Sequence, residues 1–278
     1  VKEVNEALQK GNVIINGSWD KSTMGGYEGS DVLQIPAGRT LTVKGDFNST
    51  GLRGITFGNT SSKLAVDGKL TVGVELIDAL ANVSAGGVKI HESFTFSGKM
   101  SVTGDLEVPS GVTLTITGTV NAGSVSGDGT IIVLSTSSLH IAGNVASGVT
   151  IQTGNGVAKT NGYLEVKGTM AGKLDDRNVA PSATASAPTQ KIATITGEVK
   201  MSGGARLSTE TFTPIKIDLA AGATITLTNG TASAPNIEVK DKTGNVIETG
   251  SEEVTFTVGA ATGLVDVPTG STKAPVVS

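Results

Sequence analysis

The sequence contains no cysteine, which excludes disulfide bonds, thiol nucleophiles and cysteine metal sites. Aromatic residues make up only 3% of its 278 residues, so few side chains are available to stack on sugar rings. No apolar run approaches the roughly eighteen residues that a membrane-spanning helix needs. Basic residues are not in excess either, because the net charge is −4, and nucleic acid binds to positively charged faces. We therefore expect neither a membrane span nor a nucleic-acid partner.

The amino terminus shows no secretion signal. The first residue is Val, and no charged segment followed by an apolar segment comes after it. We interpret the sequence as a mature chain whose signal peptide has been removed, or as a shortened chain. The lack of cysteine does not fix the compartment, because many secreted microbial proteins also lack it.

Glycine is abundant, with 38 residues, and it is the fourth residue of a recurring sequence of 13 residues, which we call the repeated phrase. Residues 108–120 read VPSGVTLTITGTV. Similar wording occurs at residues 35–47, 145–157 and 219–231. After its glycine each copy alternates apolar and polar, mostly hydroxyl, residues, and this period of two predicts a strand with one buried face. Seven positions after that glycine stand Gly45, Gly118, Asn155 and Asn229, where we expect a corner with positive φ.

The spacing of the copies indicates a repeat architecture. The glycines at the head of the phrase are Gly38, Gly111, Gly148 and Gly222, which lie 73, 37 and 74 residues apart. A period of about 37 residues, when halved, gives about 18 or 19 residues for each coil. Weaker strand-like segments begin at residues 63, 87, 138, 163 and 193.

Two short segments have helical spacing. Val4, Ala7 and Leu8 fall on one face of a helix that Gly11 would end. In a stack of coils such a helix would cover the exposed core of the first coil. A second helical candidate covers residues 74–81.

The opening of the chain reads VNEALQKG, then NVIINGSW, then LQIPAGRTLTVKG. With the repeated phrase, this pattern resembles the parallel β-helix, or β-solenoid, of bacterial and archaeal surface proteins and adhesins. The resemblance covers about residues 1–175 and implies an all-β fold of stacked coils with a short capping helix. That family includes enzymes, adhesins, surface-layer proteins and phage spikes, so the resemblance does not fix the function.

An antiparallel sandwich is the alternative fold. Five dipeptides are typical of hairpin turns: Asn16-Gly17, Asp67-Gly68, Asp128-Gly129, Asn161-Gly162 and Asn229-Gly230. We expect a solenoid domain at residues 1–174 and a Pro/Ser/Ala-rich linker or exposed loop at 175–190. Residues 191–278 would form a β-rich carboxyl-terminal domain, with a sandwich as one option, that ends in an extended tail.

Few residues suggest chemistry. The histidines, His91 and His140, lie in strand-like text and are interpreted as surface or stacked strand residues. The enzymatic candidate is Asp175-Asp176-Arg177, because polysaccharide-cleaving β-helices use clustered acids. This cluster borders the flexible stretch, where solvated charges are common. Neither a GxSxG elbow nor a phosphate loop occurs, so we predict no catalytic residue, no cofactor and no metal site.

Other polar and aromatic residues receive structural interpretations. We expect core or loop-anchoring roles for Trp19, Tyr27 and Tyr163. Asp67, Asp105 and Asp128 are interpreted as turn residues. Acceptor sequences for N-glycosylation begin at Asn16, Asn48, Asn59, Asn82 and Asn229.

The sequence thus predicts a structural extracellular protein, a subunit of a surface layer or filament, or an adhesin. The tail of Ala274, Pro275, Val276 and Val277 is expected to add as a strand to the next copy and so form a homo-polymer. Contact with cell-wall or surface glycan is a further expectation. The alternatives are a carbohydrate-active lyase or hydrolase, and a phage-type attachment spike, which would be an obligate trimer.

Overall fold

The computed structural model describes residues 1–23, 28–228, 237–241, 246–250, 253–258, 265–266 and 276–277. The chain is a parallel β-solenoid of about ten turns. Its content of 52% strand and 5% helix confirms the predicted all-β fold. It divides into two compact units, Val1–Ile131 and Ile132–Ser278, and β12 (Thr130–Val133) spans the division.

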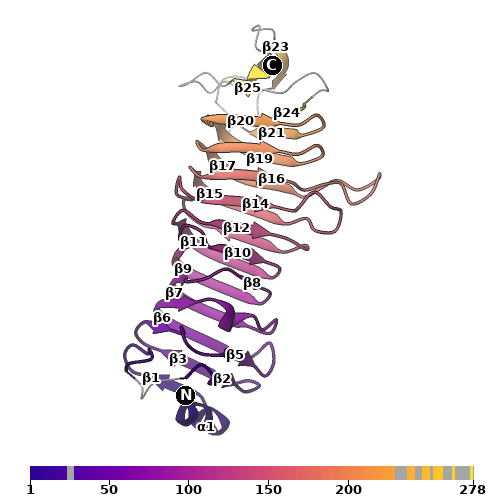
Figure 1. Cartoon of the computed structure of the whole chain (residues 1–278). Helices are drawn as coiled ribbons and strands as arrows, with labels where there is room; N and C mark the ends of the chain where they lie inside the picture. Colours follow the sequence, from indigo (N-terminus) through magenta and orange to yellow (C-terminus); the bar gives the residue numbers. More distant parts are fainter. Residues whose placement is uncertain are drawn as a thin grey trace. The chain divides into compact units, whose positions relative to one another are not determined.

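Parallel ladders join successive coils of the first unit (Figure 1). The longest ladder contains, in order, β1 (Val13–Ile15), β3 (Thr40–Val43), β6 (Lys63–Val72), β7 (Asn82–Ile90), β9 (Lys99–Glu107) and β11 (Thr119–Ser126). The short strand β4 (Phe47–Asn48) also pairs with β6. Two further parallel pairs are β2 (Val32–Ile35) with β5 (Gly54–Phe57), and β8 (Phe94–Phe96) with β10 (Thr113–Ile116).

Apolar residues of successive coils stack in register and form the core of the first unit. One such column contains Leu41, Leu64, Val83, Met100 and Val120, each at most 2% exposed. Residues between the column positions, such as Thr42 and Ser84, are half-buried. The period of two therefore does separate a buried apolar face from a polar face.

Each copy of the repeated phrase forms a strand, but the copies do not occupy equivalent positions in their coils. All four copies form strands, yet β3 and β10 lie in different ladders of the first unit. In the longest ladder, partners on neighbouring coils are 17 residues apart for Asn82 and Lys99 but 28 apart for Val13 and Leu41. Coil length is therefore variable, and the spacing of about 37 residues is not a structural period.

The expected corner with positive φ is wrong wherever the structure tests it. Gly45, Gly118 and Asn155 do not have positive φ, and Asn229 lies outside the described residues. Positive φ occurs instead at the head of the phrase, at Gly38 (70°), Gly111 (76°) and Gly222 (87°). The tight turn therefore precedes the strand. The glycine seven positions later, as at Gly45 and Gly118, is instead required by close contact with the backbone of the neighbouring coil.

The antiparallel alternative is wrong for the described part of the first unit, where strands pair in parallel. Asp67-Gly68, for example, lies inside β6 and forms no hairpin. The ladder between β6 and β7 shifts register between Val66 and Lys69, which is the position of a bulge. A dipeptide that suits a hairpin turn also suits a bulge, because both need a permissive backbone.

Parallel coils continue in the second unit. One ladder contains β13 (Ser138–Ile141), β15 (Tyr163–Met170), β17 (Thr189–Ile195), β19 (Arg206–Phe212) and β21 (Thr224–Thr228). The other contains β14 (Thr150–Thr153), β16 (Lys173–Asp176), β18 (Glu198–Met201) and β20 (Lys216–Leu219). Residues 180–186 are exposed, as expected of a loop. The parallel ladders continue across this segment, because β15 pairs with β17 and β16 pairs with β18.

The last described strands introduce antiparallel pairing. β24 (Glu253–Thr257) pairs antiparallel with β21, and β22 (Ile237–Asp241) pairs antiparallel with β23 (Val246–Gly250). The terminal strand β26 (Val276–Val277) pairs in parallel with β22 and antiparallel with β25 (Val265–Asp266). Ala274 and Pro275 of the expected assembly tail lie outside the described residues.

The amino-terminal helix α1 (Lys2–Lys10) covers the start of the first unit. Val4 and Leu8 are buried and Gly11 ends the helix, as expected, although Ala7 is exposed. The Asn5 side chain pairs with the backbone of β2: Nδ2 donates to Val32 O at 2.8 Å, and Gln34 N donates to Oδ1 at 2.8 Å.

The second helical candidate is reduced to the 3₁₀ turn η1 (Val74–Leu76). Within the described residues, no helix combines the length and the apolar character needed to cross a bilayer.

Candidate functional site

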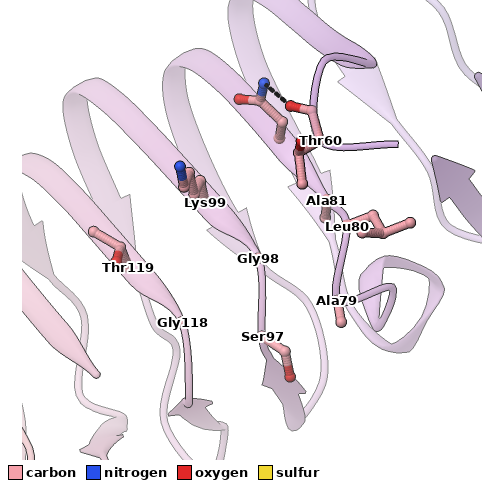
Figure 2. A pocket seen from close by; sticks show the side chains of 10 residues that line it. Thr60, Ala79, Leu80, Ala81, Ser97, Gly98, Lys99, Gly118 and Thr119 are labelled. Atoms are coloured by element: carbon pink, nitrogen blue, oxygen red, sulfur yellow. Dashed lines mark hydrogen bonds between the residues drawn. The ribbon is translucent and has the colours of Figure 1, made fainter. Parts of the chain in front are cut away.

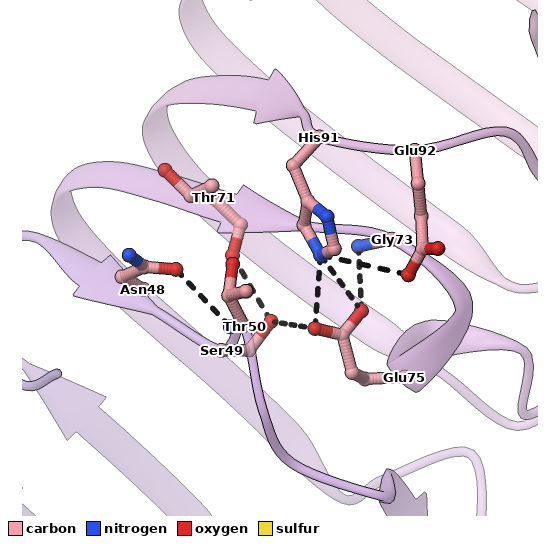
Figure 3. Close-up of polar contacts among 8 residues, drawn as sticks. All are labelled: Asn48, Ser49, Thr50, Thr71, Gly73, Glu75, His91 and Glu92. Carbon is pink, nitrogen blue, oxygen red and sulfur yellow. Dashed lines mark hydrogen bonds and ion pairs between the residues drawn. The ribbon is translucent and has the colours of Figure 1, made fainter. Parts of the chain in front are cut away.

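A buried carboxylate, Glu75, lies in η1, directly after β6. Glu75 is only 2% exposed. Two neighbours fix the carboxylate: Gly73 N donates to Oε2 at 2.8 Å, and Ser49 Oγ lies 3.4 Å from Oε1 (Figure 3). Because burying a charge is costly without partners, these contacts define both the place and the orientation of the carboxylate.

His91 and Glu92 converge on this carboxylate from the next coil. His91 Nε2 lies 3.0 Å from Glu75 Oε1 and 3.2 Å from Oε2, and it lies 3.8 Å from Glu92 Oε1. The side chain of His91 is 21% exposed and that of Glu92 is 46% exposed. Figure 3 shows both side chains pointing toward Glu75, so the group is fixed at one side and open to solvent at the other.

Parallel pairing brings these residues together, because the carboxyl ends of β4, β6 and β7 meet at one corner. His91 N donates to Val72 O at 3.0 Å and thus extends the ladder by one residue beyond the partners Val72 and Ile90. Gly73 provides the space. A Cβ on Gly73 would lie 2.5 Å from Glu92 Cγ and 2.9 Å from His91 Nε2.

The ligand atoms of Glu75, His91 and Glu92 all lie within 4.8 Å of one another. Imidazole nitrogen and carboxylate oxygen are ligands for divalent transition metals. The sequence prediction missed this grouping. Glu75 and His91 are 16 positions apart, and only the register between β6 and β7 places the two residues together.

The predicted enzymatic candidate has a different environment from the expected flexible border. Asp175 and Asp176 belong to strand β16 and are 5% and 0% exposed, respectively. Arg177 Nε donates to Asp175 Oδ2 at 2.9 Å, and its NH2 donates to the same atom at 2.6 Å. Thr153 Oγ1 and Asn178 N each donate to Asp176 Oδ1 at 3.0 Å. A substrate bound at the surface could not contact the Asp176 carboxyl without rearrangement of the coil.

Burial raises the pKa of Asp176 to about 7, although its hydrogen bonds favour the ionised form. A shift of this kind also marks catalytic acids. Here the carboxyl belongs to a buried polar network that includes Asn178, whose Oδ1 accepts from Gly162 N at 3.0 Å. The network holds the backbone of the loops beside β14 and β16, which gives the buried carboxyl a structural purpose.

His140 lies in strand β13, in agreement with its predicted interpretation. His140 Nδ1 is 3.0 Å from Glu165 Oε2, and this hydrogen bond lowers the pKa of Glu165. Tyr163 packs against the His140 ring at a centroid distance of 5.5 Å. Burial raises the pKa of the Tyr163 hydroxyl. His140 thus has one carboxylate partner, whereas His91 has two nearby.

Tyr163 also lines a hollow of about 440 Å³ beside the Pro/Ser/Ala-rich loop. Its other lining residues include Lys159, Asn161, Pro181 and Pro188. Asn161 is held by Val179, since its Nδ2 donates to Val179 O at 2.7 Å and its Oδ1 accepts from Val179 N at 3.0 Å. The hollow is therefore lined by an aromatic ring, two prolines and several polar side chains.

A smaller hollow of about 160 Å³ lies in the first unit, at a corner where successive coils meet (Figure 2). Gly98, Gly118 and Leu80 are among its lining residues, together with Asn82 of one acceptor sequence. Asn82 Nδ2 donates to Thr60 O at 3.3 Å, so its amide is already engaged. Asn16, Asn48 and Asn59 are exposed, and Asn229 lies outside the described residues.

The remaining singled-out residues have mostly structural positions. Trp19 is fully buried and stacks on Phe47 at 4.9 Å, which agrees with the expected core role, whereas Tyr27 lies outside the described residues. The interpretation of Asp67 and Asp105 as turn residues is wrong, because these residues lie in β6 and β9. Asp105 accepts from the Ser124 hydroxyl at 2.8 Å, so it links neighbouring coils.

No protein-family model, curated protein or solved structure matches this chain. Its function is therefore inferred from its own residues.

Proposed function

We propose that this chain is a structural subunit of a secreted cell-surface assembly: a surface layer, a filament or an adhesin. The observation that carries the proposal is the in-register stacking within each unit. Backbone ladders join neighbouring coils, and apolar columns such as the one that contains Leu41 and Val120 fill their interior. Stacking of this kind distributes stability over many similar contacts. Thr and Ser, such as Thr42 and Ser84, alternate with the apolar columns and reduce the exposed apolar surface, which suits a scaffold.

Assembly would use a strand edge that has no strand partner in the described fold; α1 occupies the backbone of β2 at this end through Asn5, whereas β1 lies at the end of a different sheet. β1 lies at one end of its sheet, and β3 is its one strand partner in the described part of the chain. Ile14 in β1 is 60% exposed. We propose that the tail containing Val276 and Val277 adds to such an edge on a neighbouring copy and produces a homo-polymer. The pairing of β26 with β22 and β25 in its own chain would then be exchanged for pairing between chains.

The test compares the full chain with a chain that ends at Val267, by light scattering and electron microscopy over a range of concentrations. We expect the full chain to form filaments or sheets and the shortened chain to stay monomeric. Ile14→Lys should also prevent assembly, because a charge on an edge strand opposes strand addition. Val157→Lys, at a position 58% exposed and away from strand edges, is the matched control.

A full chain that stays monomeric at high concentration contradicts the proposal. Equal assembly of the shortened chain contradicts the tail-exchange mechanism. A discrete trimer would favour the attachment-spike alternative.

Contact with surface glycan is a second candidate function, favoured by the hollow beside Tyr163. Sugar rings pack against aromatic and other apolar faces while polar groups at the rim bind their hydroxyls. A glycan array would test this function. Binding that is lost in Tyr163→Ala and retained in Tyr163→Phe would support it, whereas no binding by the full chain would contradict it.

A further inference from the structure

We propose that Glu75, His91 and Glu92 form a binding site for a divalent transition metal ion of the zinc class. The proposal goes beyond a purely structural role and does not depend on assembly.

The distances between the donor atoms suit one ion bound among them. With metal–ligand bonds of about 2.0–2.2 Å, two ligands of a tetrahedral zinc ion lie about 3.4 Å apart. The distances from His91 Nε2 to the nearer oxygen of Glu75 and to Glu92 Oε1 are 3.0 Å and 3.8 Å. These two values lie on either side of the tetrahedral value, and all three donor atoms lie within 4.8 Å of one another, so side-chain rotations would bring them around one ion.

The surroundings of Glu75 resemble the outer shell of a metal site. Metal-binding carboxylates are commonly fixed by hydrogen bonds from groups behind them. Gly73 N holds Oε2 at 2.8 Å, and Ser49 contributes a hydroxyl near Oε1. Gly73 also lacks the Cβ that would displace His91 and Glu92. Glycine at this position therefore serves the convergence of the three side chains.

The charge and exposure of the group fit a cation that enters from solvent. Two carboxylates face one imidazole, so the donor set is −2 when the histidine is neutral. Glu92 is 46% exposed, which leaves an open side for entry and for a water molecule as a fourth ligand. Among the described residues, this is the one place where at least three His, Asp or Glu ligand atoms come this close together.

A simple ion pair between His91 and Glu75 is the competing explanation, and the chain contains a control for it. His140 and Glu165 form a pair with the same 3.0 Å separation, but they are not part of a three-ligand group. If a His–Glu pair were sufficient, both pairs would behave alike toward metal. If three ligands are required, only the group at Glu75 should bind.

The experiment uses the full chain without an affinity tag, treated with chelator and titrated with Zn²⁺ by calorimetry. We expect one ion per chain, with His91→Gln and Glu92→Gln each weakening binding by at least about tenfold. His140→Gln is the matched control and should bind as the parent does. Zinc should also raise the melting temperature of the parent and the control but not that of His91→Gln. Co²⁺ added to the parent should give the visible absorption of a tetrahedral site.

Glu92→Gln keeps the proposal testable if His91→Gln fails to fold, because the Glu92 side chain is 46% exposed and glutamine has nearly the same size. Absence of Zn²⁺ binding to the parent would overturn the proposal. Unchanged binding by Glu92→Gln, or equal loss in His140→Gln, would overturn it too, since either result separates binding from this group.

Discussion

The carbonyl oxygen of Gly98 occupies the space in which a side chain on Gly118 would begin. A Cβ built on Gly118 would lie 2.1 Å from Gly98 O and 2.5 Å from Ser97 O. The backbones of two neighbouring coils therefore touch at this corner. Since backbone atoms cannot move aside as a flexible side chain can, any larger residue at Gly118 must displace a coil.

Asparagine substitutions separate close approach from backbone conformation. Gly111 has φ 76° and open space where its Cβ would lie, whereas Gly118 has crowding without positive φ. Asparagine tolerates positive φ but not a clash. We expect Gly111→Asn to cost less than about 1 kcal/mol and Gly118→Asn to cost about 1–3 kcal/mol or more. Denaturant unfolding of both variants measures the difference, and equal costs would contradict the close-approach explanation.

Asp176 should make stability depend on pH. Its pKa is raised from 3.8 to about 7 on folding, so the folded chain retains a proton that the unfolded chain releases between these values. The contribution of Asp176 to stability should therefore be fully present below about pH 4, be lost as the pH rises toward 7, and stay constant above that. The loss is at most about 4 kcal/mol, at roughly 1.4 kcal/mol per pKa unit.

Asp176→Asn tests that prediction, because the amide stays neutral and its oxygen can still accept from Thr153 and Asn178. We expect this variant to exceed the parent in stability at pH 8 and to lose the advantage at pH 4. Asp218→Asn, at an exposed position in β20, is the control and should show no such crossover. If the unfolding free energies of Asp176→Asn and the parent differ by the same amount at every pH, the carboxyl does not titrate as described.

The fold was largely predictable because its signal is local. The alternation in residues such as Thr40, Leu41, Thr42 and Val43 is a property of one strand, and it identifies the buried face without knowledge of the partner strand. Coil length was not predictable from the phrase. The segment that joins β1 to its partner β3 is longer than the one that joins β7 to β9, and nothing in the strand sequences specifies how many residues intervene.

The site was less predictable because it depends on register between coils. His91 could be seen in the sequence, but its neighbour Glu75 follows a different strand, and the shift between Val66 and Lys69 decides which residues align. Asp176 shows the same limit. Its position beside a Pro/Ser/Ala-rich stretch suggested solvation, whereas pairing of β16 with β14 and β18 buries it.

We expect no cleavage of polysaccharides by the full chain. Asp175 accepts two hydrogen bonds from Arg177, and Asp175 and Asp176 are only 5% and 0% exposed, so neither carboxyl is placed to contact a bound sugar. Reducing-end and unsaturated-product assays on a panel of plant and microbial polysaccharides would measure both reaction types. Activity that disappears in Asp175→Asn or Asp176→Asn would establish the carbohydrate-active enzyme in place of the structural subunit.

Asn5 should protect the backbone edge of β2 at the start of the first unit. It pairs with Val32 O and Gln34 N, the backbone groups that a further strand would otherwise use. Asn5→Ala should cost about 1–2 kcal/mol through the two lost hydrogen bonds and accelerate hydrogen exchange of the Gln34 amide. Gln9→Ala, an exposed position on the same helix, is the control and should leave that exchange unchanged. Unaltered protection of Gln34 in Asn5→Ala would mean that the apolar contacts of Val4 and Leu8 alone cap the solenoid.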